Sequence, residues 1–245
     1  MTPAAMEPIM TRRARKERVR HDILEAAAGL LARNGYHGMS MRDLAADSGT
    51  NLANLYNYFA SKQELLFALQ TRSFETLIAA AERAVAEAGD DPGRLHAFIL
   101  NHVRFVSEHP DVMRVLVEEA GELPAAHRRA VRRLKERYYA LGEARVRAVM
   151  SDAGATRTAR DGGAVERATY AVFGMLNWIY AWYQPRRHGS PEEVACALSR
   201  MAFGGLAAPA PHRATPGPRG RRIARIRVPS PIAPGRRGLV NGSRP

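Results

Sequence analysis

The stretch from residue 35 to residue 67 constrains the fold more than any other part of this 245-residue chain. It reads GYHGMSMRDLAADSGTNLANLYNYFASKQELLF. We expect two short helices in it, one that follows Ser40 to about Asp47 and one over 52–58. The turn between them contains Gly49, and glycine suits a left-handed backbone position there. Two short helices joined by such a turn predict a helix-turn-helix.

Helix-capping signals lie at both ends of this unit. Ser40 and Asp43 have the S-x-x-D spacing of a helix N-terminus, and Ser61 with Glu64 forms a capping box that begins a long helix. Before the unit, an amphipathic helix ends at Asn34-Gly35. The pattern therefore predicts three helices that pack together, followed by a longer fourth.

The rest of the chain to residue 206 also has helical patterns, and no strand pattern is evident. Proline and glycine separate the expected helices, which cover about 92–108, 111–121, 125–151, 163–184 and 191–204. The predicted fold class is all-α, with a three-helix helix-turn-helix domain followed by a larger helical domain.

The second short helix has two chemically different faces. Leu52, Leu55 and Phe59 share an apolar face that should pack on the first helix of the pair. The opposite face presents small and polar side chains, namely Ala53, Asn54, Asn57 and Tyr58. Asparagine can form two hydrogen bonds with adenine in the major groove, and tyrosine hydroxyls suit phosphate oxygens. The alternative is a three-helix cap with no DNA-binding role.

These residues resemble the DNA-binding domain of the TetR family of bacterial transcriptional repressors. The resemblance covers roughly residues 17–67, and its most specific part is the pattern L-Y-x-Y-F-x-S-K-x-E-L-L at 55–66. Its other parts are Gly35-Tyr36, the run from Ser40 to Ala45, and Ser48-Gly49.

The resemblance implies a set of DNA contacts. Tyr56, Tyr58 and Lys62 would contact phosphates, and Arg42, Leu52, Asn54 and Asn57 would lie at or near the bases. The predicted DNA-binding set also includes residues at the start of the second helix, Thr50, Asn51 and Ala53. Thr50, Leu52 and Asn57 depart from the usual family pattern, which bears on the operator sequence rather than on DNA binding itself.

Charge divides the chain further. Of the formal net charge of +13, the nine arginines of residues 207–245 supply nine, because that proline-rich stretch has no acidic residue. We expect it to be disordered, as either a nonadaptive extension or a basic arm on nucleic acid. The predicted domains are a flexible basic N-terminal arm (1–16), the helix-turn-helix domain (17–64), a ligand-binding and dimerisation domain (65–206) and the tail (207–245).

The expected helix 163–184 is apolar nearly all round, so burial on several sides is predicted. With the helix 191–204 it could form a four-helix bundle across a two-fold axis, giving a homodimer. A core within one chain is the alternative. The run from Gly174 to Tyr183 and the segment Ser190-Pro191-Glu192-Glu193 resemble the C-terminal domain of a TetR subgroup that senses acyl-CoA thioesters.

A ligand cavity is expected among the helices that follow residue 92, because apolar clefts between helices are common ligand sites. Each candidate residue has plain core packing as its alternative. The predicted ligand-binding residues are Phe98, His102, Phe105, Met113, Leu116, Leu134, Tyr138, Leu141 and Asn177.

No pattern typical of an enzyme is present. The sequence has no glycine-rich phosphate loop, no nucleophile elbow and no metal-ligand spacing. We therefore predict no catalytic activity, no cofactor and no metal ion. Cys196 is interpreted as a core residue. No apolar run is long enough for a transmembrane helix, and a cytoplasmic protein is expected.

The predicted function is a ligand-responsive repressor. It would bind a pseudo-palindromic, double-stranded DNA operator as a dimer and be released by a small apolar or acyl-CoA-like effector. The alternatives are an architectural DNA-binding protein without an effector, and a helical enzyme with a vestigial helix-turn-helix.

Overall fold

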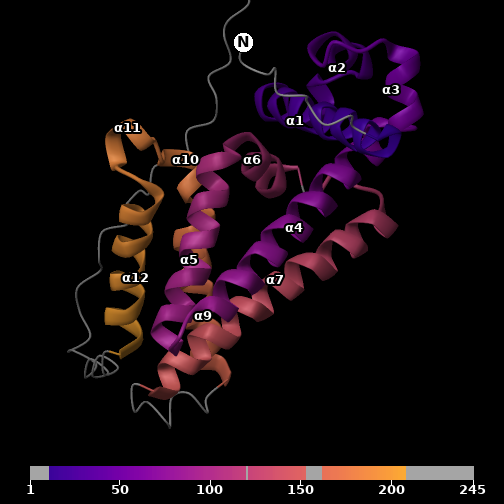
Figure 1. The fold of residues 1–245 in the computed structure, drawn as a ribbon. Helices are drawn as coiled ribbons and strands as arrows, with labels where there is room; N and C mark the ends of the chain where they lie inside the picture. Colours follow the sequence, from indigo (N-terminus) through magenta and orange to yellow (C-terminus); the bar gives the residue numbers. More distant parts are fainter. Residues whose placement is uncertain (1–10, 120, 153–161, 208–245) are drawn as a thin grey trace, which may run out of the picture. The chain divides into compact units, whose positions relative to one another are not determined.

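The computed structural model describes residues 11–119, 121–152 and 162–207. The described residues are helical and contain no strand, as predicted (Figure 1). The predicted tail lies outside them except for residue 207. The helices are α1 (Arg12–Gly38), α2 (Met41–Asp47), α3 (Leu52–Tyr58), α4 (Lys62–Glu87), α5 (Asp91–Glu108), α6 (Pro110–Glu118), α7 (Ala125–Asp152), α9 (Gly162–Asn177), α10 (Ile179–Trp182), α11 (Pro185–His188) and α12 (Pro191–Ala207).

Helix α1 begins earlier than the predicted domain boundary implies. Residues 12–16, expected in a flexible arm, are helical because the Thr11 side chain caps the helix, accepting a hydrogen bond from the Ala14 amide at 3.2 Å. The predicted end at Asn34-Gly35 is confirmed, since Gly35 has φ 69° and breaks the helix. One further helical turn follows it.

The helix-turn-helix forms where the sequence predicts it. Ser40 and Asp43 make both hydrogen bonds of a capping box at the start of α2, and Gly49 in the turn has φ 65°. At the start of α4 only the serine half of the predicted box forms among the described contacts. Ser61 Oγ accepts from the Glu64 amide at 3.2 Å, whereas the Glu64 carboxylate lies 3.6 Å from His127 of α7.

The larger part is a bundle of long helices. Helix α4 packs against α5 and α7, α12 packs against α5, and α1 packs against α6 (Figure 1). Helix α4 runs without interruption through the predicted domain boundary at residues 64–65. One continuous helix therefore belongs to both parts of the molecule.

The prediction of a single helix over 163–184 was wrong. Helix α9 ends at Asn177, and the short helix α10 follows Trp178, whose carbonyl accepts a tight-turn hydrogen bond from Ala181 at 3.1 Å. The apolar pattern continues across the break without proline, and the nearest glycine before it, Gly174, lies inside α9. No helix-breaking residue therefore marked the break.

The predicted burial of this region on several sides does not occur within one chain. Trp178 is 60% exposed, and Tyr170 and Met201 are also exposed. Cys196 on α12 is exposed too, so its assignment to the core was wrong. Its neighbours Val194 and Ala195 carry the buried face of the helix instead.

Candidate DNA-binding surface and effector cavity

The orientation of α3 is fixed by burial on one side. Leu55 is completely buried and Phe59 is nearly so, in the same core as Leu44 of α2. Leu52 is only half-buried at the edge of that core. The opposite side of the helix therefore faces outward.

The first turn of α3 is held by its own polar side chains. Asn51 Oδ1 accepts from the Asn54 amide at 2.7 Å, and Asn54 Nδ2 donates to Thr50 Oγ1 at 2.8 Å. In this arrangement Thr50, Asn51 and Asn54 cap the helix. They present an ordered edge rather than freely rotating side chains.

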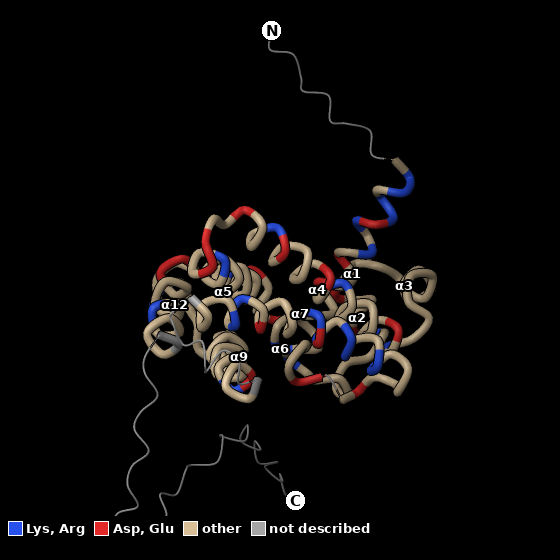
Figure 2. The backbone as a smooth tube through the Cα atoms, turned by 90° about the horizontal axis from the view of Figure 1, so that it is seen from below, with Lys and Arg blue, Asp and Glu red and all other residues tan. Residues whose placement is uncertain are grey.

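The outward side of α3 carries the remaining predicted DNA contacts. Ala53, Tyr56 and Asn57 are exposed, and Tyr58 is half-buried against the core. The helix has no charged residue (Figure 2). An uncharged face with an exposed amide is suited to hydrogen bonding with base edges.

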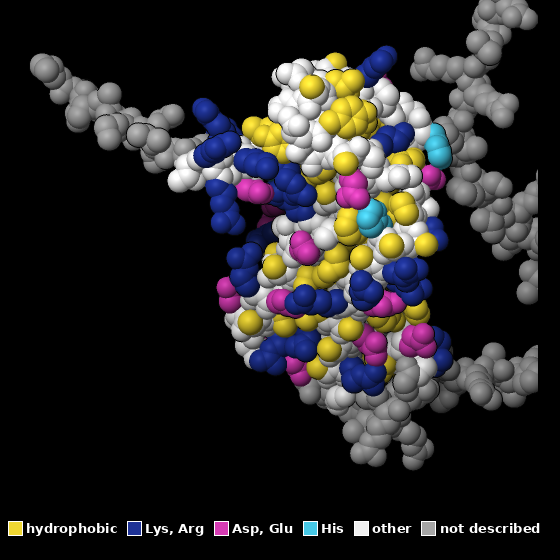
Figure 3. Space-filling model, turned by 90° about the vertical axis from the view of Figure 1, so that its right-hand side faces the viewer, with side chains coloured by type: hydrophobic (Ala, Val, Ile, Leu, Met, Phe, Trp, Pro, Cys, Tyr) yellow, Lys and Arg dark blue, Asp and Glu magenta, His cyan; other side chains and the backbone are white. Residues whose placement is uncertain are grey.

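Positive charge lies beside this face. In Figure 2 the first turns of α1 are mostly blue, and they are exposed; they carry Arg12, Arg13, Arg15, Lys16 and Arg18. Figure 3 shows dark blue side chains gathered where α1 leaves the body of the molecule. Arg42 at the start of α2 is exposed as well. Such charges favour a polyanion.

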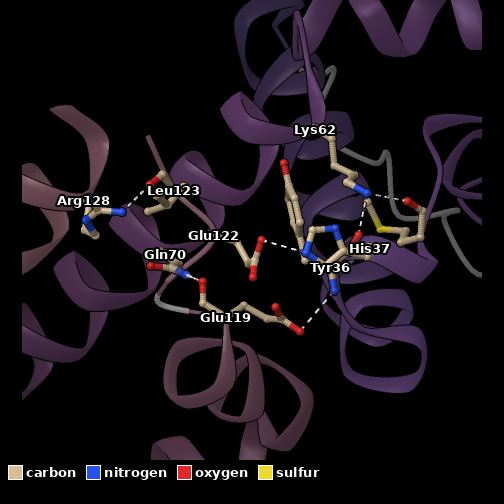
Figure 4. Close-up of polar contacts among 9 residues, drawn as sticks. Tyr36, His37, Lys62, Gln70, Glu119, Glu122, Leu123 and Arg128 are labelled. Carbon is tan, nitrogen blue, oxygen red and sulfur yellow. Dashed lines mark hydrogen bonds and ion pairs between the residues drawn. The ribbon is translucent and has the colours of Figure 1, made fainter. Parts of the chain in front are cut away.

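Lys62 has a structural role that the sequence did not reveal. Its ammonium group donates to the carbonyl oxygen of Tyr36 and to that of Met39, the latter at 2.7 Å (Figure 4). It also lies 4.3 Å from the centre of the Tyr36 ring. An ammonium group has three N–H donors, so one is left for a phosphate oxygen.

The break at Gly35 leaves backbone groups that α6 and the segment after it satisfy. In an unbroken helix the Tyr36 amide would bond to the Ala32 carbonyl. Instead, the Tyr36 amide donates to Glu119 Oε1 at 3.1 Å, and the Ala32 carbonyl accepts from Arg114 at 3.4 Å. The end of α1 is thus tied to the bundle by its main chain.

Further contacts extend this connection (Figure 4). The buried Gln70 of α4 donates to the Glu119 carbonyl at 3.3 Å, and His37 lies 3.0 Å from Glu122. The segment between α6 and α7 therefore bonds both to α4 and to the end of α1. None of these contacts follows from local sequence spacing.

A cavity of about 530 Å³ opens in the helical bundle. Five predicted ligand-binding residues line it: His102, Met113, Leu116, Tyr138 and Asn177. The other four do not. Phe98 is fully buried against Tyr138 and Phe173, Phe105 lines a smaller cavity of about 130 Å³, and Leu134 and Leu141 are half-buried at the edge of the core.

The remaining wall of the cavity was not predicted. Two of its residues come from α4, which precedes the helices among which the cavity was expected, and the others come from α6, α7 and α9. They are Phe74, Leu77, Val117, Lys135, Glu136, Tyr139, Tyr170 and Phe173. The apolar spacing of α4 and α7 is visible in the sequence. The sequence does not show which other helices pack against these apolar faces.

The cavity wall includes polar groups away from water. His102 Nδ1 lies 3.0 Å from the Tyr138 hydroxyl. Burial lowers the pKa of His102 to about 4, against a smaller raising effect of the Leu176 carbonyl, so the imidazole is neutral at physiological pH. Burial also raises the pKa of the Tyr138 hydroxyl and lowers that of the Lys135 ammonium group.

The described part of the chain holds no cluster of histidine, cysteine or acidic side chains that could bind a metal ion. None of its helices combines the length and the apolar content needed to cross a membrane.

Sequence comparison places both parts of the chain in one family. Residues 23–69 match the family of bacterial regulatory proteins named tetR, and residues 88–206 match a tetracyclin repressor-like C-terminal domain. The transcriptional repressor KstR of Mycolicibacterium smegmatis is 32% identical over 97 residues, which are 40% of this chain and 47% of KstR. The alignment thus spans about half the length of that relative.

Solved structures extend the likeness to most of the described residues. PfmR, a TetR family transcriptional regulator from Thermus thermophilus, is 30% identical, with a TM-score of 0.64 over 74% of this chain and 96% of PfmR. AibR, solved with isovaleryl coenzyme A and operator DNA, has a TM-score of 0.64 over 76% of this chain and 98% of AibR. At 24% identity, AibR shows the shared fold alone.

Members of this family are DNA-binding regulators rather than enzymes, and they bind operators as dimers. That description agrees with the capped helix α3, with the helical bundle and its cavity, and with the two matching domains. The chain belongs to the TetR family of ligand-responsive transcriptional regulators.

Proposed function

We propose that this regulator is a repressor that binds a pseudo-palindromic operator as a homodimer and leaves it when an effector occupies the cavity. The carrying observation is the outward face of α3, where Ala53, Tyr56 and Asn57 are exposed on a helix whose other side is buried. A chromosomal operator implies that the protein works in the cytoplasm.

The DNA contacts divide into two kinds. Asn57 supplies an amide for base edges, and the small Ala53 lets the helix approach them closely. Tyr56, Tyr58 and the third N–H of Lys62 bind phosphates, together with Arg42. Thr50, Asn51 and Asn54 hold the first turn in place, with Leu52 beside the bases.

Dimerisation is supported by apolar groups that one chain leaves exposed. Trp178, between α9 and α10, and Met201 of α12 are exposed outside the monomer core, although such large apolar side chains are usually buried. We propose that α9, α10 and α12 pack on the same helices of a second copy across a two-fold axis. Two recognition helices could then enter successive major grooves.

Effector release needs a physical connection between the cavity and the DNA-binding helices. Helix α6 lines the cavity with Met113 and Leu116, and the residue after its end, Glu119, bonds to Tyr36 of α1. An effector that binds one arrangement of α6 better than another shifts the population between two spacings of the recognition helices. AibR was solved with an acyl-CoA. This similarity favours an apolar or acyl-CoA-like effector.

The test is to select the operator from random DNA with the full chain, and then to measure Asn57→Ala by fluorescence anisotropy. We expect operator binding to weaken by about 1–3 kcal/mol while binding to random DNA stays unchanged. The substitution removes a contact to a base and leaves the phosphate contacts in place.

Asn34→Ala is the matched control, since Asn34 is an exposed asparagine at the far end of α1. It should bind both DNAs as the parent does. Equal losses on operator and random DNA for Asn57→Ala would contradict base reading by α3. A selection that yields no preferred sequence would favour an architectural DNA-binding protein instead.

A further inference from the structure

The cavity contains a hydrogen-bonding group with no partner. His102 is 1% exposed and its ring lines the cavity. Burial lowers the pKa of the ring and the Leu176 carbonyl raises it by less, but Nε2 itself makes no hydrogen bond within the described structure. A buried polar atom without a partner costs free energy, which a ligand that bonds to it recovers.

The neighbours of His102 determine which kind of partner Nε2 requires. His102 Nδ1 lies 3.0 Å from the Tyr138 hydroxyl, and the neighbouring Asn101 is bound through its Nδ2 to the Leu77 carbonyl at 3.2 Å. When the Tyr138 hydroxyl donates to Nδ1, a neutral imidazole carries its hydrogen on Nε2, so this atom is a donor that needs an acceptor in the cavity.

Lys135 brings a positive charge to the same cavity. Its ammonium group donates to the Leu116 carbonyl at 3.3 Å and lies 5.6 Å from the centre of the Phe74 ring. Within the described structure no carboxylate lies at ion-pair distance from it. The acidic residue of the cavity wall, Glu136, is paired with Arg132 at 3.5 Å.

Apolar groups make up most of the remaining wall, including Leu77, Met113 and Phe173. A ligand must therefore combine an apolar body with an oxygen acceptor for His102 and a negative charge for Lys135. A thioester or amide carbonyl supplies the acceptor but leaves Lys135 without a counter-ion. A carboxylate supplies both.

We propose that the cavity selects an apolar monocarboxylate, whose carboxylate pairs with Lys135 and accepts a hydrogen bond from His102 Nε2. This inference rests on the proposed function and narrows the class of its effector to free organic acids. Lys135 favours a ligand with a negative charge, whereas His102 donates a hydrogen bond to the ligand oxygen whether or not that oxygen is charged.

The test measures ligand binding to the full chain by isothermal titration calorimetry. The probes are octanoate, decanoate and 4-phenylbutyrate, each compared with its own amide and its own coenzyme A thioester. We expect at least one acid to bind about tenfold or more tightly than its amide and its thioester, because only the acid has a negative charge on the group that meets His102 and Lys135.

Variants then assign the preference to the two residues. Lys135→Met should weaken acid binding by about tenfold and leave amide binding within about twofold. Arg133→Met, the same change at an exposed site on the same helix, should leave both unchanged. His102→Leu should weaken acid and amide alike, whereas His102→Gln, which keeps an N–H donor, should restore much of the loss. Thermal unfolding checks that each variant is folded.

Two results would overturn the proposal. One is that no acid binds more tightly than its amide or thioester, and the other is that the preference survives in Lys135→Met. Operator binding is measured separately without ligand. Acid selectivity in a protein that binds no operator would contradict the proposed function alone, and operator binding without acid selectivity would contradict this inference alone.

Discussion

The helix-turn-helix and the effector cavity are stabilised in different ways. Around α2 and α3, polar side chains bond to backbone groups three residues away, as Ser40 does with Asp43 and Asn51 with Asn54. Around the cavity, the contacts join residues far apart in the sequence, such as His102 and Tyr138. Helices α2 and α3 are therefore specified locally, and none of their buried side-chain polar atoms lacks a partner within the described structure. The cavity is specified by distant packing, and its wall includes the unpartnered Nε2 of His102.

The largest expected effect tests the packing of the cavity region. Phe98 is fully buried, with ring centres at 5.0 Å from Tyr138 and 5.9 Å from Phe173. Phe98→Ala should lower the free energy of unfolding by about 4 kcal/mol, because it removes a large side chain from a packed site. Urea unfolding at fixed protein concentration measures it.

Val117→Ala provides the control, because Val117 lies at the same cavity but is 41% exposed. It should change the free energy of unfolding by less than about 0.5 kcal/mol. Similar values for the two variants would mean that packing does not hold this region together.

The second prediction concerns the buried imidazole. The pKa of His102 is lowered to about 4 in the folded protein, whereas an unfolded chain takes up the proton near pH 6.5. The neutral ring therefore makes its full contribution to the free energy of unfolding above pH 6.5. This contribution is lost as the pH falls from 6.5 toward 4. The loss reaches about 3 kcal/mol.

His102→Gln should remove this part of the pH dependence, because glutamine does not titrate. Unfolding free energies of both proteins between pH 7 and pH 4 measure it, and the two curves should diverge only below about pH 6.5. Parallel curves would show that the folded state does not lower the pKa of His102, and would contradict the burial of a neutral ring in the folded protein.

The smallest expected effect tests the DNA-binding part. Lys62→Met should lower the free energy of unfolding by about 2 kcal/mol, since charged hydrogen bonds to the Tyr36 and Met39 carbonyls are lost. Arg42→Met, at an exposed cation nearby, should cost less than about 0.5 kcal/mol. If Lys62→Met is as stable as the parent and yet binds all DNA more weakly, phosphate binding is the main role of Lys62.

The same contrast explains what could be predicted from the sequence. The bounds of α3 and the turn at Gly49 followed from capping residues and a glycine, whose effects act within one helical turn. The outward position of Asn57 followed from the burial of Leu55. The second role of Lys62 did not, because its partners belong to the end of α1.

The cavity was only partly predictable for a related reason. Long amphipathic helices bury several faces, so spacing predicts that Phe98 and His102 are both directed into the helical bundle. Spacing does not predict which of the two lines the cavity. Lys135 was missed because a lysine in a charged run is usually solvated. The break at Trp178 has no proline or glycine to mark it.

The hydrogen bond from the Tyr36 amide to Glu119 also gives a way to observe the molecule at work. No helix protects this N–H, so its exchange with deuterated solvent depends on one side chain from the segment that follows the cavity-lining helix α6. The exchange rate at this single backbone site reports how often the contact between the end of α1 and the segment after α6 opens.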